Sequence, residues 1–366
     1  MKILCSKKQL AEAFKAVAGL VSAKSVSLSN QGILMEADQD HLVIKASDNE
    51  VTAVHQVGGV KVEQPGVIMV DPVIASITMD LSDETVTMEL SGEGTQIFLR
   101  GTGKDYEIPT MDPDEFRGLE GDKEGTCLVL KAEVFRTAVE RCAVAVAREA
   151  SKFAFNGILV EITEAGKVFM VGSDGRRLSV VRLEPEEKPD GKAYSLIPKR
   201  SFTDFLRALP PAGEPVRIHF SRTRMHLDLG NTTVFAQIID GEYPDYLQVV
   251  PQKASNKVVI PVRPLEEALR RIMFVSSTES PIAKLIFYSH GELEIQSVYG
   301  DKAGKESLEV QLEGEGGEIS FNPQYVLDYL KVCGRETATL YFSDNQVPGK
   351  FDDGEGFLHV VMPVSL

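Results

Sequence analysis

The chain has 366 residues, of which 43% are apolar and 25% are charged, and its formal net charge is −15. This balance is typical of a globular protein, and the length predicts two or three domains rather than one core. The longest apolar runs fall well short of the ~18 residues of a membrane span, and the early charges at the start of the chain are unlike a secretory signal.

The four cysteines have neither metal-binding nor redox spacing. They are therefore expected to be buried free thiols in a reducing cytoplasm. The excess of acidic residues, taken alone, disfavours a nucleic-acid partner, because phosphate binding depends on Lys and Arg.

The predicted helices recur with a period near 125 residues. Six are expected, over 7–20, 71–81, 131–152, 198–209, 263–275 and 322–335. The first, third and fifth carry apolar residues at helical spacing. The other three open at Pro72, Pro198 and Pro323, which lie 126 and 125 residues apart. Ser6 and Gln9 are predicted to form a capping box for the first helix.

Between these helices, runs such as TVTMEL at 85–90 alternate apolar with polar residues. Alternation is typical of antiparallel strands that are covered on one face. The sequence thus predicts an α+β protein of three repeated domains, over 1–125, 126–254 and 255–366. The alternative is three domains of one folding class without true repetition, but the agreement of the six helix starts favours a repeat.

The charge is unevenly distributed along the chain. The six predicted helices hold 16 Lys and Arg against 10 Asp and Glu, so they carry about +6 while the rest carries −21. If the helices share one surface, that surface is basic on an otherwise acidic protein. Solvated Lys and Arg are also common on helices that bind nothing, and charge alone leaves both interpretations open.

The sequence contains no recognisable catalytic constellation. RGTGKDY at 100–106 lacks two defining residues of a phosphate loop. VGSDGRR at 171–177 departs from a nucleophile elbow and instead predicts an Asp-Gly hairpin. The six histidines have no metal-ligand spacing. We therefore predict no catalytic residue, no cofactor and no metal, with an unrelated three-domain binding protein or hydrolase as the alternative.

The stretch IIDGEYPDY at 238–246 has a counterpart in YEIPTMDPDEF at 106–116, since Pro113 and Pro244 are each followed by Asp. Each stretch ends one predicted repeat. We interpret the stretch at 238–246 as a connector between domains, stiffened by proline and packed down by aromatic residues.

Five spaced motifs resemble signatures of the bacterial β sliding clamp, the β subunit of DNA polymerase III. They are FNGILVE at 155–161, GSDGRRLSV at 172–180, IDGEYPDY at 239–246, FNPQYVLDYL at 321–330 and VVMPVSL at 360–366. The resemblance implies a non-catalytic processivity factor in the bacterial cytoplasm, at the nucleoid. It implies the DNA clamp fold, closed as a head-to-tail homodimeric ring with helices inside and antiparallel sheets outside.

The same resemblance implies the partners. The ring would encircle double-stranded DNA without reading its sequence. It would also bind the replicative polymerase, the clamp loader, other polymerases and repair proteins through short hydrophobic motifs.

Carried over position by position, the resemblance implies three sets of site residues. The partner-peptide pocket would be lined by Phe155, Ser173, Gly175, Arg176, Arg177, Leu178, Pro244, Val249, Val360, Met362, Pro363 and Val364. The DNA-facing residues would be Lys24, Arg136, Arg141, Arg148, Lys152, Lys199, Arg200 and Arg207. The dimer contact would use Tyr106, Ile108, Phe274 and Val275.

Three features depart from the family pattern. Phe155 is bulkier than the usual Leu, the chain ends in Val364-Ser365-Leu366 rather than Met-Arg-Leu, and the helix over 71–81 has no basic residue. Apart from the resemblance, the apolar pocket residues would be interpreted as ordinary core.

Overall fold

The computed structural model describes residues 1–21, 31–119, 125–147 and 155–364. Its contacts divide the chain into two compact units. Unit 1 consists of Met1–Ala132, Glu186–Gly191 and Arg200–Ile238, and unit 2 consists of Glu133–Pro185, Lys192–Lys199 and Ile239–Leu366.

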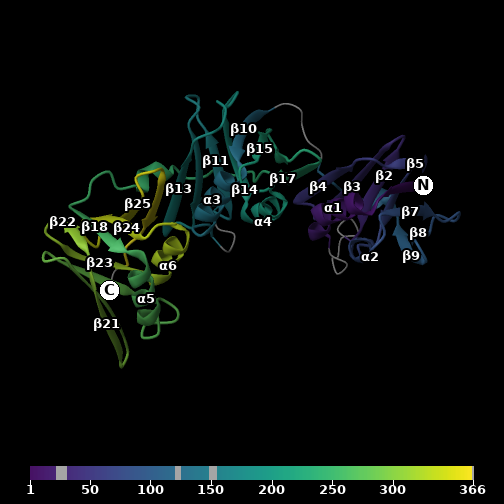
Figure 1. The fold of residues 1–366 in the computed structure, drawn as a ribbon. Coiled ribbons are helices and arrows are strands. Elements are labelled where there is room, and N and C mark those ends of the chain that lie inside the picture. The colour runs from purple at the N-terminus through teal and green to yellow at the C-terminus, as the bar shows by residue number, and fades with distance from the viewer. Residues whose placement is uncertain (22–30, 120–124, 148–154, 365–366) are drawn as a thin grey trace. The chain divides into compact units, whose positions relative to one another are not determined.

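Six α-helices form over the described residues (Figure 1). They are α1 (Lys7–Val17), α2 (Val73–Asp80), α3 (Ala132–Ala143), α4 (Lys199–Ala208), α5 (Val262–Met273) and α6 (Pro323–Val332). Each lies where the sequence predicts a helix. The helix predicted over 131–152 does not continue unbroken, however, since α3 ends at Ala143, and residues 148–152 lie outside the described residues.

The described part of unit 1 contains one antiparallel sheet of 13 strands, in the order β10-β15-β16-β17-β4-β3-β2-β6-β9-β8-β7-β1-β5. The strands are β1 (Lys2–Ser6), β2 (Ile33–Asp38), β3 (His41–Ser47), β4 (Val51–Val57), β5 (Lys61–Gln64), β6 (Gly66–Val70), β7 (Thr85–Leu90), β8 (Gln96–Gly101), β9 (Lys104–Met111), β10 (Thr126–Lys131), β15 (Pro215–Phe220), β16 (Arg224–Asp228) and β17 (Thr232–Gln237).

The described part of unit 2 contains two antiparallel sheets, of nine strands (β14-β11-β12-β13-β26-β25-β24-β18-β22) and of four (β21-β20-β19-β23). The strands are β11 (Gly157–Ile162), β12 (Val168–Ser173), β13 (Arg177–Leu183), β14 (Ala193–Pro198), β18 (Asn256–Pro261), β19 (Ala283–Tyr288), β20 (Glu292–Tyr299), β21 (Lys302–Glu309), β22 (Gln311–Glu313), β23 (Gly317–Phe321), β24 (Thr337–Phe342), β25 (Gly349–Asp352) and β26 (Phe357–Val361).

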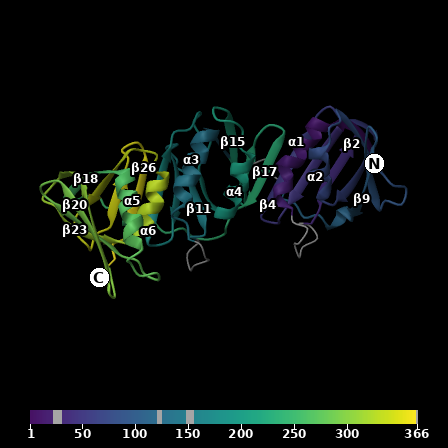
Figure 2. The ribbon, with the colours of Figure 1, turned by 60° about the horizontal axis from the view of Figure 1, so that its bottom comes forward.

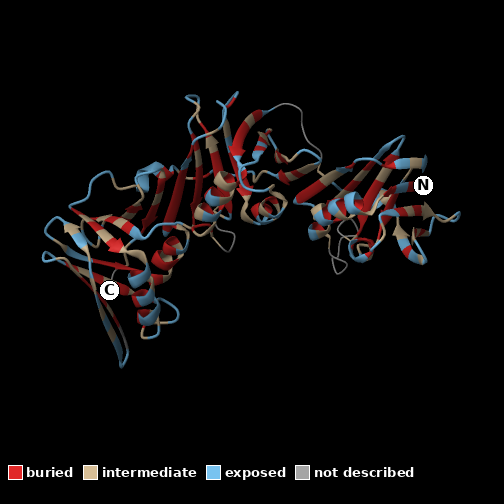
Figure 3. Ribbon diagram, in the orientation of Figure 1, coloured by how far each residue is buried: buried red, intermediate tan, exposed pale blue. Residues whose placement is uncertain are grey.

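Each unit contains one pair of helices that pack side by side. α1 lies beside α2 and against β3 and β4, while α5 lies beside α6 and against β20 and β21 (Figure 2). The apolar stripes of α1 and α5 are buried, and their opposite faces are exposed (Figure 3). One-sided burial of this kind is why both sequences show apolar residues at 3.6-residue spacing.

The sheets run continuously across the predicted domain boundaries. In unit 1, β17 pairs with β4, so the last strand of the second repeat extends the sheet of the first. In unit 2, β26 pairs with β13, so the last strand of the third repeat extends the sheet of the second. These two pairings are why the compact units do not follow the period of the sequence.

Among the described residues, no helix combines the length and the apolar character needed to cross a bilayer. The four cysteines are free; Cys5, Cys142 and Cys333 are buried and Cys127 is half-buried.

Candidate functional site

A pocket of about 90 Å³ lies in unit 2 where β13 and β26 meet residues 239–250, the second connector. We call it the unit 2 pocket. Its floor is the cross-strand pair Leu178 and Val360, both almost completely buried. The pair belongs to an apolar cluster with Leu159, Val171 and Leu196, so the floor continues directly into the core of the sheet.

The second connector forms one wall of this pocket because its tyrosines anchor it to the sheet. Tyr243 and Tyr246 are buried, and the Tyr246 hydroxyl donates a hydrogen bond of 2.7 Å to Glu161 Oε2. Burial raises the pKa of Tyr246, and the bond to Glu161 raises it further. Asp245 caps the 3-10 turn η4 (Tyr246–Val249) by accepting from the Leu247 N–H at 3.1 Å. The predicted packing of the connector by aromatic residues is confirmed.

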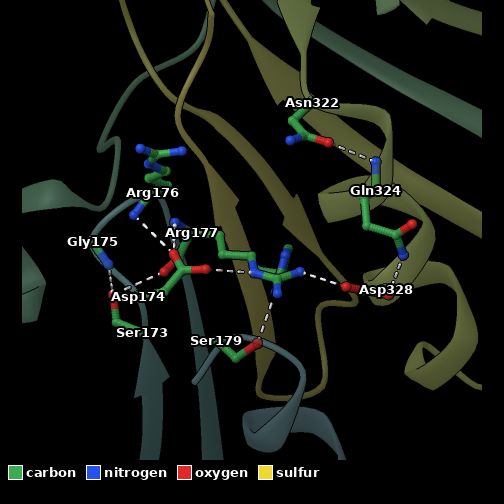
Figure 4. A network of polar contacts seen from close by, with 10 residues as sticks. Ser173, Asp174, Gly175, Arg176, Arg177, Ser179, Asn322, Gln324 and Asp328 are labelled. Carbon is green, nitrogen blue, oxygen red and sulfur yellow. Dashed lines mark hydrogen bonds and ion pairs between the residues drawn. The ribbon is translucent and has the colours of Figure 1, made fainter. Parts of the chain in front are cut away.

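The opposite wall is the hairpin between β12 and β13, and Gly175 at its tip has φ +82. The Ser173 hydroxyl donates to the Arg177 carbonyl at 2.8 Å and accepts from the Gly175 N–H at 3.1 Å (Figure 4). The Asp174 carboxylate accepts from the N–H groups of Arg176 and Arg177 at 2.9 and 3.0 Å. The Asp-Gly hairpin predicted from VGSDGRR is therefore confirmed, with Ser173 and Asp174 holding the loop closed.

Arg177 ties this hairpin to α6. Its guanidinium donates to Asp174 Oδ2 at 3.1 Å and to Asp328 Oδ2 at 2.8 Å (Figure 4), and it lies 4.5 Å from the centroid of the Tyr325 ring. Burial alone would raise the pKa of Asp328, but hydrogen bonds from Arg177, Lys331 and Gln324 hold it below its usual value. The pocket wall is thus fixed by charge-assisted bonds rather than by loop packing alone.

Phe155 and Met362 close the remaining sides. The Phe155 ring packs edge-on against Tyr243, with centroids 5.7 Å apart and planes at 88°. Met362 is 39% exposed and also lines an adjoining cavity of about 340 Å³. Besides Met362, this second cavity is lined by three of the predicted pocket residues, Arg176, Pro363 and Val364.

The structure thus brings the predicted pocket residues together in two cavities that share Met362. Nine of the twelve line the unit 2 pocket itself. Sequence reasoning missed Tyr243, Asp245 and Tyr246, which also line it. Their signal was present in the motif GEYPDY, whose tyrosines were assigned to packing of the connector only.

The unit 2 pocket offers apolar surface rather than reactive groups. The Ser173 hydroxyl is engaged with backbone. The buried His359 on β26 accepts or donates a 2.8 Å hydrogen bond through Nδ1 to Ser179, and burial lowers its pKa to about 3. Within the described residues, no three His, Cys, Asp or Glu side chains are placed to hold a metal. A pocket of this kind suits the side chains of a bound peptide.

Seven of the eight predicted DNA-facing residues fall into three groups. Arg200 and Arg207 on α4 are each 65% exposed, and they pair with Asp48 at 2.7 Å and with Asp204 at 3.1 Å. Arg136 and Lys199 are half-buried. Lys24, Arg148 and Lys152 lie outside the described residues.

Arg141 has a different role from the one predicted. Its guanidinium lies 3.6 Å from the buried Asp353, donates to the carbonyls of Val332 and Cys333, and lies over the Phe357 ring. Because these contacts leave only 19% of its side chain exposed, we remove Arg141 from the DNA-facing set.

Of the predicted dimer contacts, Phe274 stands out because it is 80% exposed at the end of α5. Tyr106 on β9 is 38% exposed, and Val275 is half-buried. Ile108, in contrast, is only 2% exposed. Its side chain points into the core of unit 1, so Ile108 can contribute only backbone to a dimer contact, and we correct its assignment accordingly.

Relatives and solved structures match the chain over its full length. Proteins named beta sliding clamp from Chlamydia muridarum and Streptomyces coelicolor are 26% and 27% identical to it, and each match covers all of this chain and at least 99% of the relative. The crystal structure of the DNA polymerase III β subunit from Pseudomonas aeruginosa is 23% identical and superposes with a TM-score of 0.93 over 100% of both chains.

Family profiles give the same result domain by domain. Those of the N-terminal, central and C-terminal domains of the DNA polymerase III β subunit match residues 1–120, 129–245 and 247–365. The three profiles follow one another in order and together span nearly the whole chain, which therefore belongs to the family of bacterial DNA polymerase III β subunits, the β sliding clamps.

Proposed function

We propose that the chain is a non-catalytic processivity clamp, which closes around duplex DNA as a head-to-tail homodimer and tethers DNA-processing proteins through the unit 2 pocket. The proposal rests on the family and, most directly, on the unit 2 pocket. A mainly apolar recess lies there beside the partly exposed Met362, whose unbranched side chain can adapt to a partner peptide.

The dimer contact is supported by an open strand edge in each unit. Residues Lys104–Ile108 of β9 pair with β8 alone among the described strands. Among the strands that the structure describes, β21 likewise lies at the edge of its sheet and pairs only with β20. One edge belongs to unit 1 and the other to unit 2, so a contact between them joins the head of one protomer to the tail of its partner. Two such contacts close a ring and cover both edges.

Exposed side chains flank the same two edges. Phe274 at the end of α5 and Tyr106 on β9 both expose aromatic surface. Arg271 on α5 is bound to Glu306 on β21 by two hydrogen bonds of 2.7 and 2.9 Å, which fixes the end of α5 beside that edge strand. Burial of the Phe274 ring by a partner protomer would remove a large apolar surface from water and stabilise the dimer.

DNA would be held by encirclement, and contact with it would be weak. The guanidinium groups of Arg200 and Arg207 are exposed and can meet phosphates without reading bases. Each guanidinium also pairs with a largely buried carboxylate, Asp48 or Asp204, which offsets part of its charge and limits its attraction for phosphate. The net charge of −15 disfavours adsorption of DNA elsewhere on the protein.

The unit 2 pocket would receive the hydrophobic motif of a replicative polymerase, clamp loader or repair protein. A volume of about 90 Å³ accommodates little more than one apolar side chain, so Phe155 and Met362 are expected to move apart when a larger residue enters. Neighbouring residues of the motif would lie in the adjoining cavity, along Arg176, Pro363 and Val364.

Sedimentation velocity across a range of protein concentrations tests the assembly on which this function depends. We expect a species of twice 40.1 kDa that persists into the nanomolar range. A 40.1 kDa monomer at all concentrations would contradict the proposed ring.

A further inference from the structure

The structural repeat places a second groove in unit 1 at the position that corresponds to the unit 2 pocket. In unit 1, Thr52 on β4 pairs with Phe235 on β17. In unit 2, Leu178 on β13 pairs with Val360 on β26. The matching residues are 126 and 125 positions apart, which is the repeat period. Thr52 and Phe235 line a cavity of about 820 Å³, which we call the unit 1 groove.

A connector of the same design borders each of the two sites. In the first connector, residues 112–119, Asp112 caps the 3-10 turn η3 (Pro113–Glu115) by accepting from the Asp114 N–H at 2.9 Å. This is the same kind of cap as that of η4. Pro113 and Asp114 line the unit 1 groove, just as Pro244 and Asp245 line the unit 2 pocket. Both the strand pair and the connector wall of the pocket therefore recur.

The unit 1 groove is wider because its connector is packed down less completely. The second connector buries Tyr243 and Tyr246 in the sheet. In the first connector, Phe116 is only half-buried. This connector is attached instead by a hydrogen bond of 2.8 Å from the Leu119 N–H to Thr52 Oγ1. The space that tyrosines fill in unit 2 is thus left open in unit 1.

The lining of the unit 1 groove combines apolar surface with one ion pair. Val54, Phe116 and Phe235 are half-buried along it, and Val67 at its side is 52% exposed. On the floor, Lys45 Nζ lies 2.8 Å from Glu36 Oε2, and the two side chains keep 21% and 35% of their surface exposed. Both charged groups therefore remain accessible to a ligand.

We propose that the unit 1 groove is a second peptide-binding site of this chain. Its occupant is a short extended segment of a protein partner. A large apolar side chain of that segment packs between Phe116 and Phe235, and neighbouring residues of opposite charge meet Glu36 and Lys45. The inference rests on the proposed function in one respect, since it transfers peptide binding from the unit 2 pocket to its counterpart in the repeat. The larger volume and the ion pair predict a different peptide from the one bound in unit 2.

The test uses two matched variants of the full chain. Val67→Arg places a bulky charge in the unit 1 groove, and Val249→Arg does the same in the unit 2 pocket. Val67 and Val249 are 52% and 46% exposed, so neither substitution disturbs a packed core. Unchanged circular dichroism and melting temperature verify folding. Phe116→Ala, which removes a half-buried side chain from the groove, provides a second variant of the same site.

The probe is a phage-displayed library of random dodecapeptides, selected on the Val249→Arg chain. Enriched peptides are then synthesised and titrated by fluorescence polarisation against wild type, Val67→Arg and Phe116→Ala. We expect peptides with an aromatic or leucine residue beside charges of both signs, and a loss of affinity of at least about tenfold in both groove variants. Peptides for the unit 2 pocket, selected separately on wild type, should bind Val67→Arg as well as they bind wild type.

The two ideas fail in different ways. If selection on Val249→Arg enriches nothing, or only peptides that are unaffected by Val67→Arg and Phe116→Ala, the second site is refuted. In that case, wild-type binders that are lost in Val249→Arg leave the proposed function intact. If wild type itself enriches no peptide, both ideas are contradicted.

Discussion

The Arg177 network predicts that a single substitution loosens the wall of the unit 2 pocket. Arg177→Ala removes the cation that bonds Asp174 at 3.1 Å and Asp328 at 2.8 Å. The three side chains are 9%, 16% and 14% exposed, so the two carboxylates would remain largely buried without their partner. Removing one member of a buried ion pair costs about 3–5 kcal/mol.

We expect Arg177→Ala to reduce stability by about 3 kcal/mol, near the lower end of this range, because the carboxylates keep some of their other partners. Asp328 keeps hydrogen bonds from Gln324 and Lys331, and some water reaches both carboxylates. Arg177→Lys preserves the charge but not the forked geometry, so it should cost about half as much. Comparing Arg177→Ala with Arg177→Lys therefore separates the effect of losing the charge from that of losing the forked geometry.

The assay is native-state hydrogen exchange read on the peptides that contain β13 and α6, because a chain with two compact units need not unfold in one transition. A loss of about 3 kcal/mol corresponds to roughly a hundredfold faster exchange in these segments. Asp328→Ala should lower the free energy of opening by less in the Arg177→Ala background than in wild type. The difference, which is the coupling energy between the two residues, should be about 2 kcal/mol. An acceleration below about tenfold, or strict additivity of the two substitutions, would refute the role assigned to Arg177.

Four further predictions concern pH dependence, the pocket, the dimer and DNA. The pKa of Asp328 is lowered in the folded chain, so its network stabilises the fold fully above the unfolded pKa of 3.8. This stabilisation is lost as the pH falls through the folded pKa of Asp328. Wild type and Asp328→Asn should therefore be equally stable below the folded pKa. Met362→Ala should weaken binding of pocket-selected peptides about tenfold in fluorescence polarisation, because it removes a wall common to both cavities; equal affinity would contradict the shared wall. Phe274→Ser should raise the dimer dissociation constant at least about tenfold in sedimentation, by loss of buried aromatic surface, without changing the melting temperature of the monomer; an intact dimer would exclude Phe274 from the contact. Arg200→Glu with Arg207→Glu should shorten retention on circular DNA, because phosphates are then repelled, while the mass of the dimer is unchanged; equal retention would show that α4 does not face DNA.

Local patterns in the sequence predict the fold well. Periodicity and prolines placed six helices correctly, because each pattern reflects burial on one face of one element. The end of α3 was missed for the same reason. The sequence CAVAVA continues the apolar pattern past Ala143, where Ala145 and Val146 remain buried although the helix has ended. No glycine or proline marks the end of this helix.

Contacts between distant segments could not be predicted in this way. Ser6 makes no capping hydrogen bond through its side chain, and the Gln9 amide lies beside Gly59 instead of completing the predicted capping box. Arg141 lies on a helix with charged neighbours, but its partner Asp353 is more than 200 positions away in the sequence. A residue pattern on one helix or strand indicates which of its faces is exposed. It does not indicate which long side chain forms an ion pair or hydrogen bond with a distant segment.

The same distinction applies to the candidate site. The motifs VGSDGRR and GEYPDY were visible in the sequence, as was the hairpin that the first of them forms. The two motifs enclose one pocket beside β26 only because β13 pairs with β26. This pairing joins segments that are about 180 residues apart in the sequence. Only the family resemblance placed these segments together in advance.

Topological linkage to DNA is the central claim, and retention on circular against linear DNA measures it most directly. Labelled protein is loaded onto nicked circular DNA by a clamp loader, half of the sample is cut with a restriction enzyme, and both halves are separated by gel filtration. We predict that the protein stays with the circle and is lost from the linear form, because a ring can slide off a free end. Equal retention on both forms would indicate ordinary DNA affinity and would contradict the clamp.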